Sequence, residues 1–214
     1  MGRSGKHPSR RVETLAGVAV VAAAGFATTA VATGTRASAH FDRKLAPRLA
    51  PRPRTRRRRI AEAMSPVGKW YVILPAGVLG GALLARDRTR RVAGATIAVS
   101  PIIAFVLAKL FDHLLPQPPV PAGHWRESNK PVFPSGHAMM SMSVAPTAAY
   151  VLSREQLAHL PSSMAAAVLF SLVHPALKLA VRKHWPTDAI GGVAAGVAIS
   201  AACCAAYEHL RDSR

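Results

Sequence analysis

Cysteine is scarce in this sequence of 214 residues. Cys203 and Cys204 are the only two, and they are adjacent. Neighbouring side chains on a helix point apart, so this pair cannot form a disulfide of normal geometry. We therefore interpret both as small packing residues, and they say nothing about the redox compartment of the protein.

Acidic residues are also few, with 10 Asp and Glu against 28 Lys and Arg, which gives a formal net charge of +18. Such an excess is typical of proteins that bind nucleic acid, but its distribution indicates otherwise. Ten of the 28 cations fall between residues 36 and 59, and most of the others flank apolar stretches. Basic loops that face anionic lipid headgroups account for this pattern better. We expect a lipid bilayer as the partner and no nucleic acid.

Lys, Arg, Asp and Glu are absent from six long stretches, which are residues 14–35, 70–85, 92–108, 131–153, 156–177 and 189–207. A helix needs about 20 residues, and roughly 17 at least, to cross the hydrocarbon core of a membrane. The sequence therefore predicts an all-α, polytopic membrane helix bundle with about six transmembrane helices.

The chain is short enough to be one structural domain, and it divides into two parts. Residues 1–66 hold a basic tail, the first transmembrane helix and an Arg-rich loop, and residues 67–214 hold a core of five transmembrane helices. Prolines and clustered arginines in segment 34–66 predict a loop or surface segment with little rigid structure. Residues 1–39 also fit a cleaved secretory signal, although the first apolar stretch is long for one and favours a retained span.

Pro134-Ser135-Gly136-His137 lies where the fourth membrane helix would begin. The first N–H groups of a helix have no intrahelical partners, and their partial positive charge attracts an anion. Gly136 would let a phosphate approach the backbone, Ser135 would cap the helix and donate to an oxygen, and His137 would supply a proton. Taken alone, the motif also fits ordinary capping beside a bystander histidine.

His184-Trp185-Pro186-Thr187-Asp188 precedes the sixth apolar stretch. Pro186 suits the first position of a helix. The carboxylate of Asp188 could accept a hydrogen bond from one imidazole nitrogen of His184, which would leave the other nitrogen free to attack. In isolation, this spacing also fits a structural pair.

Successive spans alternate in direction, so the third and fifth spans end at the membrane face where the fourth and sixth begin. Lys109 and Lys178 lie at those two ends, and they can share a pocket with the two motifs. Two histidines at converging helix starts, with lysines beside them, predict a phosphate-handling active site at one membrane face.

These residues resemble the type 2 phosphatidic acid phosphatase superfamily, the membrane lipid phosphatases whose core is also shared by glucose-6-phosphatase and the vanadium haloperoxidases. The resemblance covers roughly residues 67–207. The second family motif, PSGH, is present unchanged and ends at His137. His184 and Asp188 match the third motif, and Lys109 corresponds to the lysine of the first.

The resemblance implies that His184 is the nucleophile that forms a phosphohistidine. It implies that Asp188 orients this imidazole and that His137 protonates the leaving alkoxide. The implied phosphate-binding residues are Lys109, Ser135, Gly136 and Lys178. Neither a metal ion nor another cofactor is implied.

Two positions depart from the family motifs. The first motif has Lys, six residues and then Arg-Pro, whereas Pro116-Gln117 stand in the Arg-Pro places here. The third motif opens with Ser-Arg, where this chain has Leu177-Lys178. Lysine keeps the charge but lacks the bidentate fork of arginine. The candidates for the missing donor are Arg126, Lys130, Arg182 and Lys183. The residues interpreted as loop polar groups are Asp112, His113 and His124.

We therefore predict an integral membrane phosphatase, independent of metal, that hydrolyses the phosphate or diphosphate of a membrane lipid. The alternative is a catalytically weakened relative that binds lipid phosphates without turnover. Bacterial members of the family usually face the pocket outward, so we expect a bacterial cytoplasmic membrane with the active site outside. The cations between residues 36 and 59 do not favour this orientation, because cations are usually enriched on the inner side.

Overall fold

The computed structural model describes residues 9–33, 35–49, 55–64, 66–115, 133–181 and 183–213. Within these residues the chain forms eight α-helices, one short 3₁₀ helix and no strand. The helices are α1 (Arg10–Ala32), α2 (Arg36–Leu49), α3 (Arg56–Met64), α4 (Trp70–Leu84), η1 (Arg88–Arg90), α5 (Arg91–Leu114), α6 (Gly136–Arg154), α7 (Leu160–Ala180) and α8 (Pro186–Asp212).

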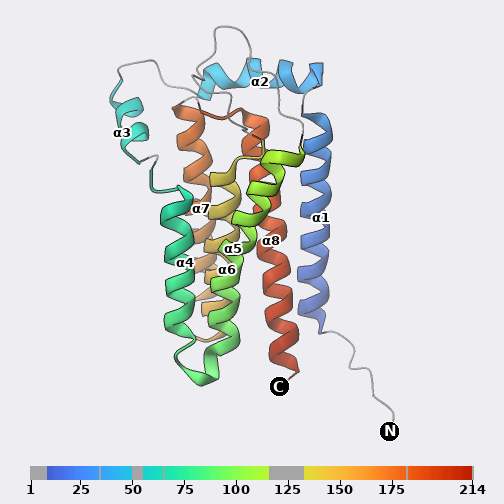
Figure 1. Ribbon diagram of the computed structural model, residues 1–214, viewed down its shortest axis with the longest axis vertical. Coiled ribbons are helices and arrows are strands. Elements are labelled where there is room, and N and C mark those ends of the chain that lie inside the picture. The colour runs from blue at the N-terminus through green and yellow to red at the C-terminus, as the bar shows by residue number, and fades with distance from the viewer. Residues whose placement is uncertain are drawn as a thin grey trace.

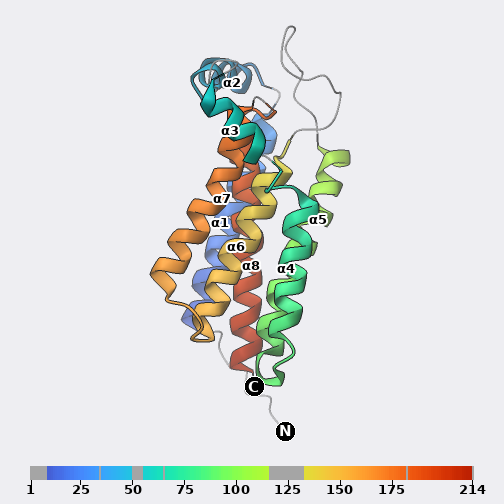
Figure 2. The same cartoon turned by 90° about the vertical axis from the view of Figure 1, so that its left-hand side faces the viewer.

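Six long helices run side by side, and α2 lies across one end of the bundle (Figures 1 and 2). Helices α1 and α6 pack along α8, while α5 and α7 pack against α6 and α4 packs against α5. Helices α6 and α8 both begin at the end that α2 crosses, whereas α1 begins and α8 ends at the other end (Figure 1).

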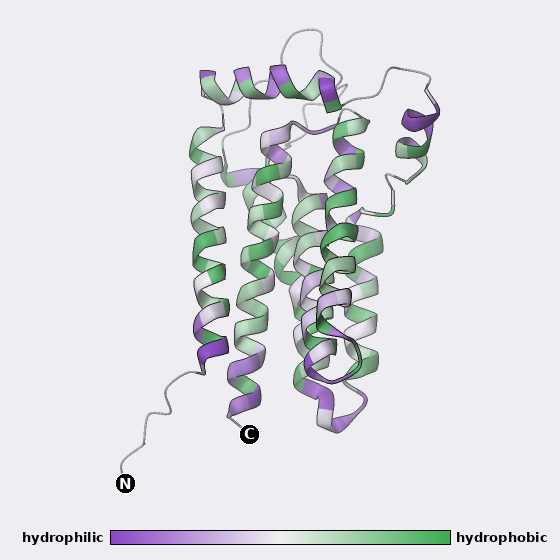
Figure 3. Cartoon of the chain, turned by 180° about the vertical axis from the view of Figure 1, so that it is seen from behind, coloured by the Kyte–Doolittle hydropathy of each residue, from purple (hydrophilic) through white to green (hydrophobic). Residues whose placement is uncertain are grey.

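Four helices among the described residues, α1, α5, α7 and α8, are long and apolar enough to cross a membrane. Apolar residues follow their length, and polar residues gather at their ends and on α2 and α3 (Figure 3). Helix α4 has 15 residues and α6 buries several hydroxyl side chains, yet both run within the same bundle. The prediction of an all-α membrane bundle is confirmed, and the chain is an integral membrane protein.

Segment 34–66 has more regular structure than the loop or surface segment that the sequence predicts, because it contains α2 and α3. Helix α2 contacts α7 and α8, and three of its residues that lie about one turn apart, Ser38, Asp42 and Ala46, are buried. Tertiary contacts of this kind stabilise short helices that propensity alone does not. The division of the chain at residue 66 stays a prediction.

Two glycines on α8 bring its backbone close to α6. A Cβ atom at Gly192 would lie 2.5 Å from the carbonyl oxygen of Ser135, and one at Gly196 would lie 2.7 Å from the Cβ of Met142. Both distances are too short for real side chains, so any larger residue would push the helices apart. The close contact between α6 and α8 therefore depends on these two glycines.

Candidate active site

Helix α6 begins where the Pro-Ser-Gly-His motif predicts. Ser135 is the residue before the helix, it is fully buried, and its hydroxyl accepts a long hydrogen bond of 3.5 Å from the N–H of Ala138. The preceding Phe133 is also fully buried, and its ring fills the space beside Gly191 of α8 and stacks on Phe26 of α1. Contacts with α1 and α8 thus hold the segment just before α6, and Gly136 and His137 are the first two residues of the helix.

Helix α8 begins at Pro186, as the sequence also predicts. The Asp188 side chain turns back and accepts a hydrogen bond of 2.8 Å from the N–H of Trp185. The same oxygen, Oδ2, lies 3.5 Å from Nδ1 of His184, which is close enough for electrostatic attraction but is not a formed hydrogen bond. Asp188 is therefore placed to orient both the turn and the imidazole.

The two motifs meet across α6 and α8. The N–H of Ser135 donates to the carbonyl oxygen of Asp188 at 2.9 Å, which ties one helix start to the other. The ring centroids of His137 and His184 lie 6.1 Å apart, with their planes at 64°. Among the described residues, three buried polar atoms here have no hydrogen-bond partner: His137 Nε2, His184 Nδ1 and Asp188 Oδ1. Buried polar atoms are usually paired, so this cluster is suited to a polar ligand.

A cavity of about 200 Å³ opens beside these histidines. Its lining comes from α4, α5 and the starts of α6 and α8, and consists of Gly68, Trp70, Phe105, Ala108, Lys109, Asp112, Pro134, Gly136, His137, Met140 and His184. Four predicted site residues, Lys109, Gly136, His137 and His184, therefore face one space. Ser135 and Asp188 lie buried behind it.

Lys109 and Asp112 occupy the α5 wall of the cavity. The Lys109 side chain is 58% exposed, and its Nζ lies 3.9 Å from Asp112 Oδ2 and 5.9 Å from the centre of the Phe105 ring. The interpretation of Asp112 as a loop polar group is wrong, because α5 continues to Leu114 and carries this carboxylate into the lining. His113 also lies on α5, and its Nδ1 contacts the carbonyl oxygen of Lys109.

Lys178 is buried in α7, behind the residues that line the cavity. It lies close enough to His137 for their charges to interact. Lys183 donates its backbone N–H to the Lys178 carbonyl at 2.9 Å, but its side chain is exposed. Five residues singled out in the sequence lie outside the described residues: Pro116, His124, Arg126, Lys130 and Arg182.

Three residues near the site were not singled out in the sequence. Lys69, directly before α4, also lies within electrostatic reach of His137. His174 lies one turn before Lys178 on α7, and its buried ring packs against Gly68, where any side chain would overlap it. Asp42 of α2 binds Thr187 in the first turn of α8. Of these three, only His174 could have been identified from the sequence, because its spacing of four residues from Lys178 puts both on one helix face.

In the described part of the chain, no group of three or more His, Cys, Asp and Glu side chains could hold a metal ion. The polar groups at the cavity are imidazoles, helix N-termini, one lysine and one carboxylate. Such a set can bind a tetrahedral anion and move a proton at its edge.

Comparison with known proteins agrees with this arrangement. The model of the PAP2 superfamily matches residues 91–212, which is more than half of the chain. Among solved structures, the fold is similar to a transmembrane PAP2-type phosphatidylglycerolphosphate phosphatase from Bacillus subtilis, with a TM-score of 0.76 and 19% sequence identity. The similarity covers 92% of this chain and 96% of that one. No curated protein matches the chain. The matched segment contains both histidine motifs, and the chain belongs to the PAP2 superfamily.

Proposed function

We propose that the protein is a membrane phosphatase that hydrolyses the phosphate or diphosphate of a membrane lipid through a phosphohistidine, without a metal ion, and that residues 67–214 form its catalytic core. The observation that carries the proposal is the pairing of His137 and His184 across one cavity at an end of the bundle. Each imidazole comes from the first turn of a helix or the residues just before it, where N–H groups attract anions.

In the first step, Nε2 of His184 attacks the phosphorus atom while the bond to the lipid oxygen breaks. Nδ1 is the nitrogen near Asp188, so this carboxylate stabilises the positive charge that develops on the ring. His137 donates a proton to the leaving oxygen, a contribution of about 10²–10⁴-fold. With a diphosphate, the leaving group is the lipid monophosphate.

In the second step, water attacks the phosphohistidine. His137 accepts the proton of this water, the P–N bond breaks, and inorganic phosphate leaves with His184 restored. Lys109, Lys178 and the free N–H groups at the start of α6 stabilise charge on the phosphate oxygens in both steps. Lys178 is buried behind the cavity lining, from where its positive charge would add to this stabilisation.

The cavity supports a lipid rather than a soluble ester as substrate. Its lining combines the apolar side chains of Trp70, Phe105 and Met140 with the two histidines. A lipid anchored in the bilayer would present its phosphate at this depth, with apolar atoms on the bundle side. The similar Bacillus protein is named as a phosphatidylglycerolphosphate phosphatase, which also favours a lipid phosphate.

We further propose that the exposed cations of α2 contact anionic headgroups on the outer side of a bacterial cytoplasmic membrane. Arg36, Arg43, Lys44 and Arg48 are exposed on the helix that crosses the cavity end. Labelling of Ala37→Cys and Arg88→Cys in intact cells tests the orientation, because these exposed positions lie at opposite ends of the bundle. An outward cavity predicts that an impermeant reagent reaches position 37 only, and labelling of position 88 alone would reverse the orientation.

A second candidate, a weakened member that binds lipid phosphate without turnover, is favoured by Pro116 and Lys178 at the places of the two motif arginines. Phosphate release from a panel of phosphatidic acid, phosphatidylglycerolphosphate and isoprenoid diphosphate, measured with purified protein and EDTA, separates the candidates. Multiple turnovers with EDTA present are expected for the phosphatase. Lipid binding without release would support the second candidate, and turnover that EDTA abolishes would contradict metal independence.

A further inference from the structure

Helix α2 crosses the bundle at the end where α6 and α8 begin (Figure 1), and the cavity lies beside these two helix starts. Its inner face consists of Ser38, Asp42 and Ala46, which are at most 9% exposed. Asp42 is an acidic residue in a segment dominated by arginine, and it points toward the protein rather than toward those cations.

Both carboxylate oxygens of Asp42 bind one residue of α8. Oδ1 accepts the backbone N–H of Thr187 at 3.0 Å, and Oδ2 accepts the Thr187 hydroxyl at 2.6 Å. Thr187 is the second residue of α8, so its N–H has no acceptor within the helix. A carboxylate here supplies that acceptor and complements the positive end of the helix dipole.

The residue that Asp42 binds stands beside the proposed catalytic pair. Asp188 follows Thr187 directly, and its side chain holds the N–H of Trp185, next to His184. The turn 184–188 is therefore fixed twice: Asp188 fixes it from within, and Asp42 fixes it from a helix 145 residues away in sequence.

A buried position is unfavourable for a carboxylate unless hydrogen bonds offset the cost of removing it from water. Burial raises the pKa of Asp42 above its ordinary value and the nearby Asp188 adds to this, while the two hydrogen bonds from Thr187 act in the opposite direction. A small apolar residue would avoid this cost but would leave the Thr187 N–H and hydroxyl buried without an acceptor.

We propose that Asp42 is a positioning residue: it acts through Thr187 to hold the first turn of α8, and with it the His184 imidazole, in the reacting geometry. The inference rests on the proposed function and adds to it a residue outside the matched segment 91–212.

The test compares kcat and KM of Asp42→Ala, Asp42→Asn and the double variant Asp42→Ala/Thr187→Val for phosphatidic acid in detergent micelles. Asp42→Ala is expected to lower kcat about 10- to 100-fold with KM changed less than about twofold, because small displacements of a reacting group cost rate rather than binding. Asp42→Asn is expected to recover most of kcat, since its amide can accept from the Thr187 N–H and donate to the hydroxyl. The double variant Asp42→Ala/Thr187→Val is expected to be no slower than Asp42→Ala.

Asp87 provides a matched control. Its Oδ1 accepts the N–H of Thr89 at 2.9 Å and the Thr89 hydroxyl at 2.7 Å, the same two kinds of donor that Asp42 binds at Thr187, but at the far end of the bundle. Asp87→Ala is expected to keep wild-type kcat.

The outcomes separate the two proposals. Wild-type kcat in Asp42→Ala would overturn the positioning role alone. Equal losses in Asp42→Ala and Asp42→Asn, matched by an equal fall in the folded fraction, would also overturn it in favour of a general stabilising role. Absence of phosphate release by the wild-type protein contradicts the proposed function instead.

Discussion

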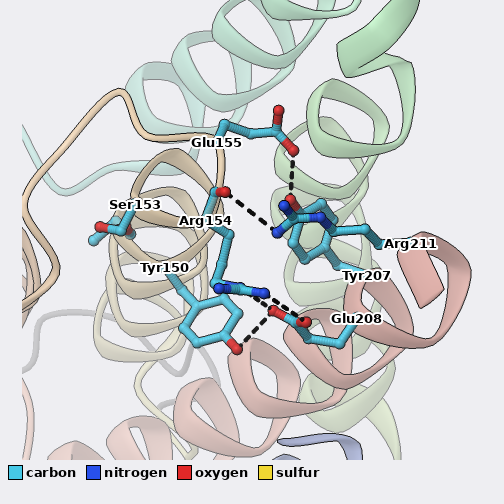
Figure 4. A network of polar contacts seen from close by, with 8 residues as sticks. Tyr150, Ser153, Arg154, Glu155, Tyr207, Glu208 and Arg211 are labelled. Atoms are coloured by element: carbon cyan, nitrogen blue, oxygen red, sulfur yellow. Dashed lines mark hydrogen bonds and ion pairs between the residues drawn. The ribbon is translucent and has the colours of Figure 1, made fainter. Parts of the chain in front are cut away.

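Helices α6 and α8 carry polar groups at both ends of their contact, and the two ends are built differently. At the end away from α2, Glu208 is 1% exposed and accepts hydrogen bonds from Arg154 at 2.6 Å and Tyr150 at 2.9 Å (Figure 4). Tyr207 donates to Glu155 at 2.5 Å. Of the buried atoms in the described residues that lack a partner, none belongs to this network.

At the cavity end, by contrast, His137, His184 and Asp188 each keep one buried polar atom without a hydrogen bond. Satisfied buried networks stabilise a fold and leave no capacity for a ligand, whereas unpaired groups lower stability and retain that capacity. The same two helices are thus joined at one end and left open to a ligand at the other.

His184→Ala is expected to lower kcat at least about 10³-fold, because it removes the proposed nucleophile. Its thermal stability in detergent should stay close to that of the wild type, because the Nδ1 atom that the substitution removes has no hydrogen-bond partner among the described residues. Phosphate release and the midpoint of thermal inactivation measure the two effects. Equal release by both proteins would refute the nucleophile assignment.

His137→Ala is expected to lower kcat about 10²–10⁴-fold with a lipid phosphate, since the leaving alkoxide then receives no proton from the protein. The loss should be much smaller with p-nitrophenyl phosphate, whose leaving group needs no proton. Parallel assays with the two substrates check this. The same loss with both substrates would assign His137 a role other than that of the acid.

Lys178→Arg is expected to keep or raise kcat, because arginine restores the bidentate donor of the family motif. Lys178→Met, which is of similar length but uncharged, should lower kcat about tenfold or more. Steady-state kinetics of the pair measure the contribution of charge. Complete loss in Lys178→Arg would show that the phosphate pocket lies elsewhere.

Glu208→Gln changes the network at the end away from α2, and it is expected to keep kcat within about twofold of the wild type. It should still lower stability, by about 3 kcal/mol, because it leaves the Arg154 charge without its buried counterion. Thermal inactivation and kcat on the same preparation test both parts. A fall in kcat with unchanged stability would contradict the proposed division between the two ends.

The sequence predicted the helix starts at the site because short local motifs determine them. Ser135 before Gly136, and Pro186 with Asp188 two residues later, are capping signals that act within one turn. The alternation of spans then brought the two starts to one membrane face. Asp112 could also have been placed at the site, because it lies three residues after Lys109 and on the same side of a continued helix.

Helix α2 and its contact could not be predicted in this way. Its inner face is Ser38, Asp42 and Ala46, which show no apolar periodicity, and its arginines and Pro47 indicate a loop. The partner of Asp42 lies 145 residues away, and no local pattern identifies Thr187 as a donor. Contacts of this kind depend on the finished packing of the bundle, so they become visible only in three dimensions.

The most direct test of the account is to capture the covalent intermediate. Protein mixed with a lipid carrying a ³²P-labelled terminal phosphate and quenched in alkali is expected to retain label on the peptide that contains His184. The label should be lost in acid, as is characteristic of a phosphohistidine, and should be absent from His184→Ala. Label on another residue, or full turnover with no labelled protein at any quench time, would contradict the central claim.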